Sequence, residues 1–269
     1  MKDIIIYSMP RTGSTALAKS FHTLKYIDFS EIFAQDFDFE IYDIKKQGII
    51  NYSVYNKVSN DTFSLKHQKL KKYYDIFYEP EYKIFKIFTS WHDVYKDEID
   101  YLKFTKNKRK ILLFRLDFFQ QIISNEITNK KIDIATCLKI DFSKYSYILK
   151  QLKNSILDIN FDEVILSEYL FYDPFYKNKF YEVFQVNYPN EQEFPLSSKI
   201  QLIKNYNSLN IEYKYSYLFQ EYKEIRNILK KKIIDNNIKL IGDIRALNWI
   251  SSRKGIQKKK QKRQRTFVF

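Results

Sequence analysis

Residues 8–15 combine side chains that bind anions with the backbone pattern of a tight loop. The segment reads S-M-P-R-T-G-S-T and follows the apolar run Ile4–Ile6. After it, apolar side chains recur at Leu17, Phe21 and Leu24, which is the spacing of one face of a helix. A strand, a loop and a helix in this order direct backbone N–H groups at an anion. The alternative is an ordinary strand-to-helix turn at the start of an α/β domain.

The loop departs from the phosphate-loop pattern G-x-x-x-x-G-K-[ST] in two places. Ser8 replaces the first glycine, and Ser14 stands where a lysine would contact the β- and γ-phosphates of a nucleoside triphosphate. Positive charge is supplied instead by Arg11, whose guanidinium can bind an oxyanion through two hydrogen bonds. The pattern therefore favours a donor with a single 5′ phosphate that carries a less charged transferable group.

The run P-R-T-G-S-T followed by a predicted helix resembles the 5′-phosphosulfate loop of sulfotransferases that use 3′-phosphoadenosine 5′-phosphosulfate (PAPS). The closest likeness is to the bacterial type that modifies carbohydrates, such as the trehalose and nodulation-factor enzymes. The resemblance implies a P-loop-like α/β fold with a central parallel sheet between helices, adenosine 3′,5′-bisphosphate (PAP) as product, and no metal. It also implies that five residues hold the 5′ phosphate: Arg11, Thr12, Gly13, Ser14 and Thr15.

A second predicted strand-to-helix junction supplies the other half of the implied site. Lys110–Phe114 is an apolar strand, and Asp117 with Gln120 three residues later is typical of the start of a helix. In the family that this chain resembles, an arginine at the strand end and a serine two turns into the helix hold the 3′ phosphate. The matching residues are Arg115 and Ser124. Because the helical rise alone leaves Ser124 about 10 Å from the cap, this role is implied by the resemblance and not by the spacing.

Three further residues are candidates for the chemistry of transfer. The resemblance implies Glu31 as the general base, and a carboxylate beside the transferring group can take the proton that an attacking hydroxyl loses. The alternative is a surface acid early in a helix capped by Ser30. Lys86 interrupts the predicted strand 82–88, so it either contacts the sulfuryl oxygens or lies in an edge strand, because an unpaired buried lysine is costly. His92 is the second candidate for the base.

The composition excludes several other classes of protein. The chain has 269 residues, of which 45% are hydrophobic and 18% aromatic, so residues 1–250 are predicted to form one domain around one core. The single cysteine, Cys137, excludes an intrachain disulfide and a cysteine-based metal cluster. No apolar run approaches the roughly 20 residues of a transmembrane helix, and the N-terminus lacks the features of a signal peptide. We expect a cytoplasmic protein.

More than half of the net charge of +14 lies near the C-terminus, because residues 253–265 carry eight basic side chains and no acidic one. We expect residues 251–269 to be a disordered tail with nonspecific affinity for polyanions. A basic nucleic-acid-binding protein is therefore one alternative function. A second is a small-molecule or nucleotide kinase that holds Mg²⁺ through Asp93 or Asp117, and a third is a family member without activity. The acceptor, a small molecule or glycan, is implied by the resemblance alone.

The rest of the pattern predicts helices and one further strand. A loop is expected at 51–60 and a strand at 161–166, and helices are expected at 65–74, 145–156, 173–184 and 213–236.

Overall fold

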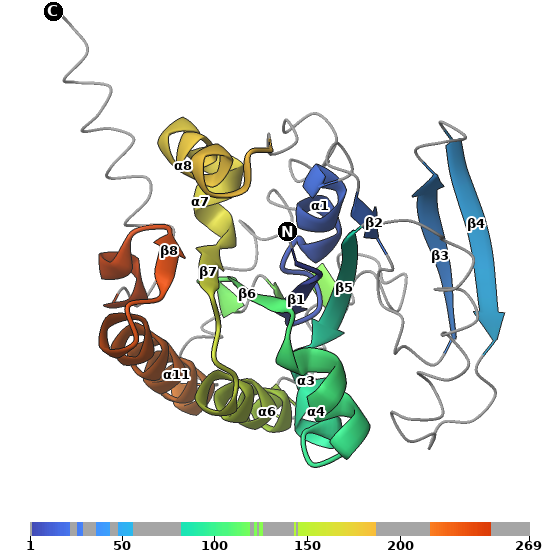
Figure 1. Cartoon of the computed structure of the whole chain (residues 1–269). Coiled ribbons are helices and arrows are strands. Elements are labelled where there is room, and N and C mark those ends of the chain that lie inside the picture. Colours follow the sequence, from blue (N-terminus) through green and yellow to red (C-terminus); the bar gives the residue numbers. More distant parts are fainter. Residues whose placement is uncertain are drawn as a thin grey trace, which may run out of the picture.

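A parallel sheet occupies the middle of the molecule (Figure 1). The computed structural model describes residues 2–21, 26–28, 36–43, 48–55, 82–118, 121–122, 124–125, 143, 145–186 and 216–248. Within them the strands of the sheet follow the order β2-β5-β1-β6-β7-β8, and all neighbours pair in parallel. The strands are β1 (Ile4–Ser8), β2 (Tyr26–Asp28), β5 (Tyr82–Phe88), β6 (Arg109–Phe114), β7 (Glu163–Leu166) and β8 (Lys239–Ile241).

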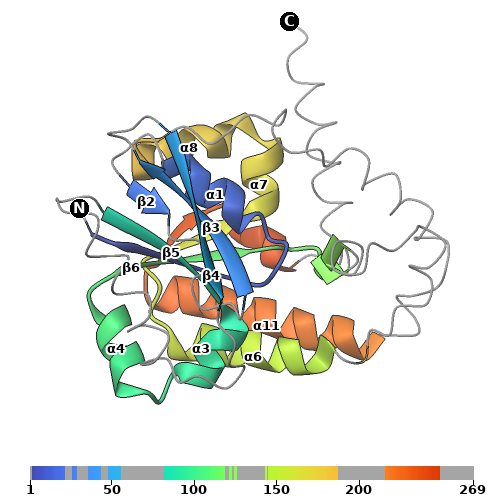
Figure 2. The same cartoon turned by 90° about the vertical axis from the view of Figure 1, so that its right-hand side faces the viewer.

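Helices cover both faces of this sheet, and the two perpendicular views agree on their placement (Figures 1 and 2). One face carries α1 (Ser14–Ser20), α7 (Ser167–Tyr172) and α8 (Pro174–Phe184). The other carries α3 (Thr89–Tyr95), α4 (Ile99–Lys106), α6 (Tyr145–Asp158) and α11 (Ser216–Asp235). A 3-10 turn, η4 (Ile244–Asn248), follows β8. The expected α/β class with a central parallel sheet is confirmed, whereas its P-loop-like character stays a prediction.

The alternation of side chains along each strand decides which face of the sheet a residue reaches. The wholly buried β1 sequence I-I-I-Y-S is typical of a parallel strand covered on both sides. Ile6 is in register with Lys86 on β5 and with Ile111 on β6. Because successive side chains point to opposite faces, these three residues face α1, and Tyr7 faces α3. The loop after β1 and the carboxyl end of β5 can therefore meet on the face of the sheet that α1 covers.

The central position of β1 also marks a topological switch point. The chain passes from β1 to β2 and β5 on one side of β1 and then to β6 on its other side, so the strand order reverses between β1 and β6. In open α/β sheets, ligands bind outside the carboxyl ends of the two strands at such a point. The segments that follow β1 and β6 are the ones that the sequence indicates as phosphate-binding.

The predicted strands at 82–88, 110–114 and 161–166 are confirmed, and so are the helices within 145–156, 173–184 and 213–236. The loop expected at 51–60 is wrong over its first five residues. They belong to β4 (Gly48–Tyr55), which pairs antiparallel with β3 (Asp36–Asp43) beside the β2 edge. The helix expected at 65–74 and the basic tail lie outside the described residues. No helix in the described part of the chain has both the length and the apolar character to cross a bilayer.

Candidate functional site at the ends of strands β1, β5 and β6

The loop between β1 and α1 is fixed by two side chains that hydrogen-bond its carbonyls. The Thr12 Oγ1 hydroxyl donates to the Met9 carbonyl at 3.0 Å, within the loop. Gln121 Nε2 donates to the Pro10 carbonyl at 2.7 Å from the helical segment that follows β6. Thr12 is buried, so its side chain sets the shape of the loop. Two polar side chains therefore support the backbone of the predicted anion-binding segment.

Two residues of this loop have left-handed backbone conformations. Gly13, the N-cap of α1, has φ 93°, and Arg11 has φ 64°. Glycine adopts positive φ without a steric penalty, but for an arginine the left-handed region costs about 1–2 kcal/mol. Strain of this kind persists where the surrounding structure enforces it, and it is concentrated at functional sites. The conformation of Arg11 therefore supports a role for this residue beyond the fold.

The two predicted phosphate-binding segments lie against each other. The Arg11 Nε group donates to the Ser124 hydroxyl at 3.5 Å, and Arg115 Nη1 donates to the Arg11 carbonyl at 2.9 Å. Arg115 directly follows β6, and Ser124 belongs to the helical segment whose first turn is closed by the bond from Gln121 N–H to the Asp117 carbonyl. The structure thus brings together residues that lie more than 100 positions apart in the chain.

Lys86 joins the same group from β5. Its side chain is 2% exposed, and the Nζ ammonium donates to the Thr15 hydroxyl at 3.0 Å. Because β5 lies between β2 and β1, the edge-strand alternative for Lys86 is wrong. Thr15 is exposed, and its neighbour Ser14, the first residue of α1, is buried. We call Arg11, Thr15, Lys86, Arg115 and Ser124 the strand-end cluster.

The structure does not bring His92 to the strand-end cluster. His92 lies on α3, across the sheet from α1, and its Nδ1 is 2.9 Å from the Tyr101 hydroxyl. That hydroxyl is 3.3 Å from the hydroxyl of Tyr7, and His92 Nε2 lies 3.9 Å from Asp158 Oδ2. Burial lowers the pKa of His92 to about 4, although Asp158 opposes the shift. The other candidate base, Glu31, lies outside the described residues.

Two residues that are not among the predicted site residues hold Arg115 in place. The Glu168 Oε1 atom accepts the backbone N–H groups of Leu116 at 2.8 Å and Asp117 at 3.1 Å, and it lies 4.0 Å from Arg115 Nε. The Tyr222 hydroxyl donates to the Arg115 carbonyl. Glu168 is the second residue after β7, the neighbour of β6, and that position is a signal that could have identified it. No sequence pattern connects Tyr222 with Arg115.

One of the two carboxylates proposed for Mg²⁺ in the kinase alternative, Asp93, has other partners. Asp93 Oδ1 accepts a hydrogen bond from Asn154 Nδ2 at 3.0 Å and lies 3.1 Å from Lys96 Nζ, between α3 and α6. This carboxylate is across the sheet from the strand-end cluster. Among the described residues, no group of three or more His, Cys, Asp or Glu side chains could hold a metal ion.

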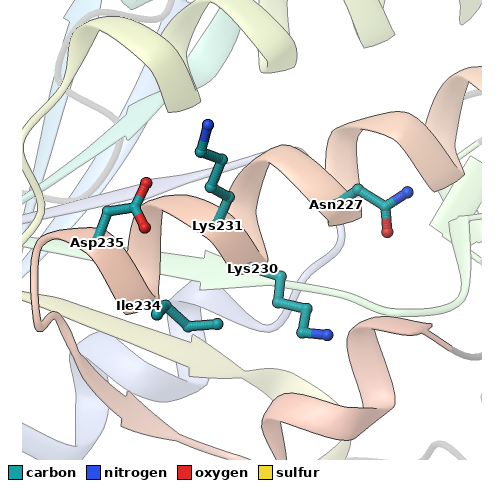
Figure 3. A pocket seen from close by; sticks show the side chains of 5 residues that line it. All are labelled: Asn227, Lys230, Lys231, Ile234 and Asp235. Carbon is teal, nitrogen blue, oxygen red and sulfur yellow. The ribbon is translucent and has the colours of Figure 1, made fainter.

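A surface hollow of about 330 Å³ lies elsewhere, along α11 (Figure 3). The side chains that line it all come from this helix: Asn227, Lys230, Lys231, Ile234 and Asp235. Lys231 and Asp235 project to one side of the helix and Lys230 to the other. Because α11 ends at Asp235, shortly before β8 begins, the hollow lies toward the amino ends of the strands. It is separate from the strand-end cluster, which lies at their carboxyl ends.

Comparison of the chain with protein-family models, with curated proteins and with solved structures gave no significant match.

Proposed function

We propose that this protein is a sulfotransferase that moves a sulfuryl group from PAPS to a hydroxyl of a small molecule or glycan. The observation that supports the proposal most is the contact of Arg11 with Ser124 and Arg115. A nucleotide with phosphates on both the 3′ and 5′ positions of one ribose needs two anion-binding groups side by side. The junctions after β1 and β6 supply such a pair at the switch point of the sheet.

The chemistry of the strand-end cluster suits this donor. Its three cationic side chains, Arg11, Lys86 and Arg115, come from three different parts of the chain, and hydroxyls lie within hydrogen-bonding distance of two of them. Guanidinium groups bind phosphate oxygens in a bidentate manner, which suits phosphates held at fixed positions. The loop has no lysine at the position that would contact a γ-phosphate, so the site suits a transferable group of lower charge.

Each residue has a distinct role in this proposal. Arg11, Thr15 and the loop amides stabilise the 5′ phosphate oxygen, which takes the electron pair of the breaking S–O bond. Lys86 balances charge on the sulfuryl oxygens, while Arg115 and Ser124 hold the 3′ phosphate. The acceptor oxygen forms the new S–O bond in line with the leaving oxygen, and Glu31 accepts its proton. The roles of Glu31 and of the 3′-phosphate pair rest on the family resemblance.

The test is PAP release from PAPS in the presence of a panel of oligosaccharide acceptors. We expect the wild type to release PAP and Arg11→Ala to do so about 100-fold more slowly. The matched control is Lys103→Ala, which removes a cation from a side chain that is 74% exposed on α4, across the sheet; it should keep the wild-type rate. Equal rates for wild type and Arg11→Ala would overturn the role of Arg11. Turnover that requires ATP and Mg²⁺ in place of PAPS would favour the kinase.

A further inference from the structure

The Arg115 residue is held from three directions by three separate parts of the chain. Its Nη1 group donates to the Arg11 carbonyl at 2.9 Å, and its Nε lies 4.0 Å from Glu168 Oε1. Its carbonyl accepts the hydroxyl of Tyr222, whose ring stacks on Phe114 and Phe118 at centroid distances of 5.5 and 4.8 Å. The side chain of Arg115 is therefore oriented before any ligand arrives, which lowers the entropic cost of binding one.

Among these partners, Glu168 is the one that carries a charge opposite to that of the guanidinium. It is a buried residue in the first turn of α7. Its Oε1 atom binds the two backbone N–H groups that follow Arg115, and Oε2 lies 3.3 Å from the Ser167 hydroxyl. Burial raises the pKa of Glu168, whereas Arg115 and the amide groups act in the opposite direction. Burying a carboxylate is costly, so a neutral side chain would serve better if only the backbone needed support.

We propose that Glu168 is the positioning residue for Arg115, and that it gives the strand-end cluster its preference for adenosine nucleotides with a 3′ phosphate. The carboxylate attracts the Nε edge of the guanidinium across 4.0 Å and accepts hydrogen bonds from the two backbone N–H groups on the C-terminal side of Arg115. Glu168 and the Arg11 carbonyl together therefore determine the orientation of the Nη groups. The inference rests on the proposed function, because it assumes that Arg115 contacts the 3′ phosphate.

The sign of the expected effect separates positioning from simple electrostatics. Removing the negative charge of Glu168 makes the potential around the site more positive, and Coulomb attraction alone would then tighten the binding of any anion. Loss of positioning has the opposite effect, and only on a ligand that uses Arg115. A comparison of two nucleotides that differ only in the 3′ phosphate therefore distinguishes these effects.

The experiment measures the dissociation constants of PAP and 5′-AMP by calorimetry for the wild type, Glu168→Gln and Glu163→Gln. At position 168, glutamine keeps a carbonyl acceptor but removes the charge, so we expect PAP to bind about tenfold more weakly while 5′-AMP binds as tightly as before or more tightly. Glu163→Gln is the matched control, because Glu163 is also buried and paired with an arginine, Arg109, but lies at the amino ends of β6 and β7. Its ratio of the two constants should stay within about twofold of the wild-type ratio.

A Glu168→Gln protein with an unchanged ratio, or with equal loss for both nucleotides, would overturn this role for Glu168 alone. A wild type that binds PAP no more tightly than 5′-AMP would overturn the proposed function as well. Arg115→Lys provides a second test that does not depend on the folding of Glu168→Gln. Lysine keeps the charge but has no Nε edge for the carboxylate to orient. We expect this variant to lose the preference for PAP over 5′-AMP too. Retention of the wild-type ratio of the two dissociation constants would contradict the proposal.

Discussion

The Nε atom of Arg11 lies 3.5 Å from the hydroxyl of Ser124, although 113 positions separate the two residues in the chain. The contact follows from the sheet, because β1 and β6 are neighbours and Ser8 is in register with Leu113. The loop after β1 and the segment after β6 consequently leave the sheet side by side. This relationship turns two short sequence patterns into one candidate site.

The left-handed conformation of Arg11 predicts that stability and activity respond differently to substitution. Arg11→Gly should be more stable than Arg11→Ala by about 0.5–1 kcal/mol, because relief of the left-handed strain exceeds the extra chain entropy that glycine adds to the unfolded state. Both variants should release PAP from PAPS about 100-fold more slowly than the wild type. Urea unfolding and the transfer assay measure the two effects. Equal stability of the two variants would contradict the strained conformation.

Lys86→Met tests whether the buried ammonium serves catalysis or the fold. Methionine has a similar length and no charge, so the free energy of unfolding should stay the same or rise, since a desolvated cation is removed. Transfer should fall about 100-fold. Lys83→Met is the matched control, because Lys83 lies on the same strand but an odd number of residues away, on the opposite face. Full activity of Lys86→Met would show that Lys86 does not contact the reacting group.

His92 should make the protein sensitive to acid without contributing to transfer. Its pKa is about 4 in the folded protein, against 6.5 as the ordinary value, so between these pH values the unfolded chain binds a proton that the folded chain does not. The free energy of unfolding should therefore fall by about 2–3 kcal/mol from this group as the pH drops from 7.5 to 4.5. The free energy of unfolding of His92→Gln should fall by correspondingly less over that interval, and this variant should keep the wild-type transfer rate. Parallel pH profiles of the two proteins, from urea unfolding, would refute this account.

Gly242 is expected to tolerate no side chain. A Cβ atom at this position would lie 2.7 Å from Leu166 Cδ1, and the Gly242 φ of 150° is rarely adopted by residues other than glycine. Gly242→Ala should therefore lower the free energy of unfolding by about 2 kcal/mol, as measured in urea. Leu166→Ala makes room for the new methyl group, so the double variant should be more stable than the sum of the two single effects predicts. Strict additivity would show that the two positions do not clash.

The strands at the centre of the sheet could be predicted because parallel strands covered on both faces are continuous apolar runs, as Ile4–Ile6 and Lys110–Phe114 illustrate. The hairpin of β3 and β4 was missed even though the alternation in β3, D-F-D-F-E-I-Y-D, is a strand signal. β8 has only three residues, which is too short for a period to appear.

Much of the candidate site could not be predicted because it depends on register between distant strands. The sequence identified Lys86 as unusual, but only its position in β5 and its bond to Thr15 decided between the edge of the sheet and the cluster. His92 lies on α3, which directly follows β5, yet α3 packs against the face of the sheet opposite to α1. The bond between Tyr222 and Arg115 spans 107 positions and leaves no local trace in the sequence.

Thermal unfolding in the presence of PAP or ADP tests the central claim most directly. The two nucleotides have the same composition and differ in the position of one phosphate. A ligand that binds only the folded protein, at 100 times its dissociation constant, stabilises it by about 2.7 kcal/mol, which raises the melting temperature of a domain of this size by about 5–10 °C. We predict a shift of this order with PAP, a clearly smaller one with ADP, and no difference between them for Arg115→Ala. An equal or larger shift with ADP in the wild type would contradict the account.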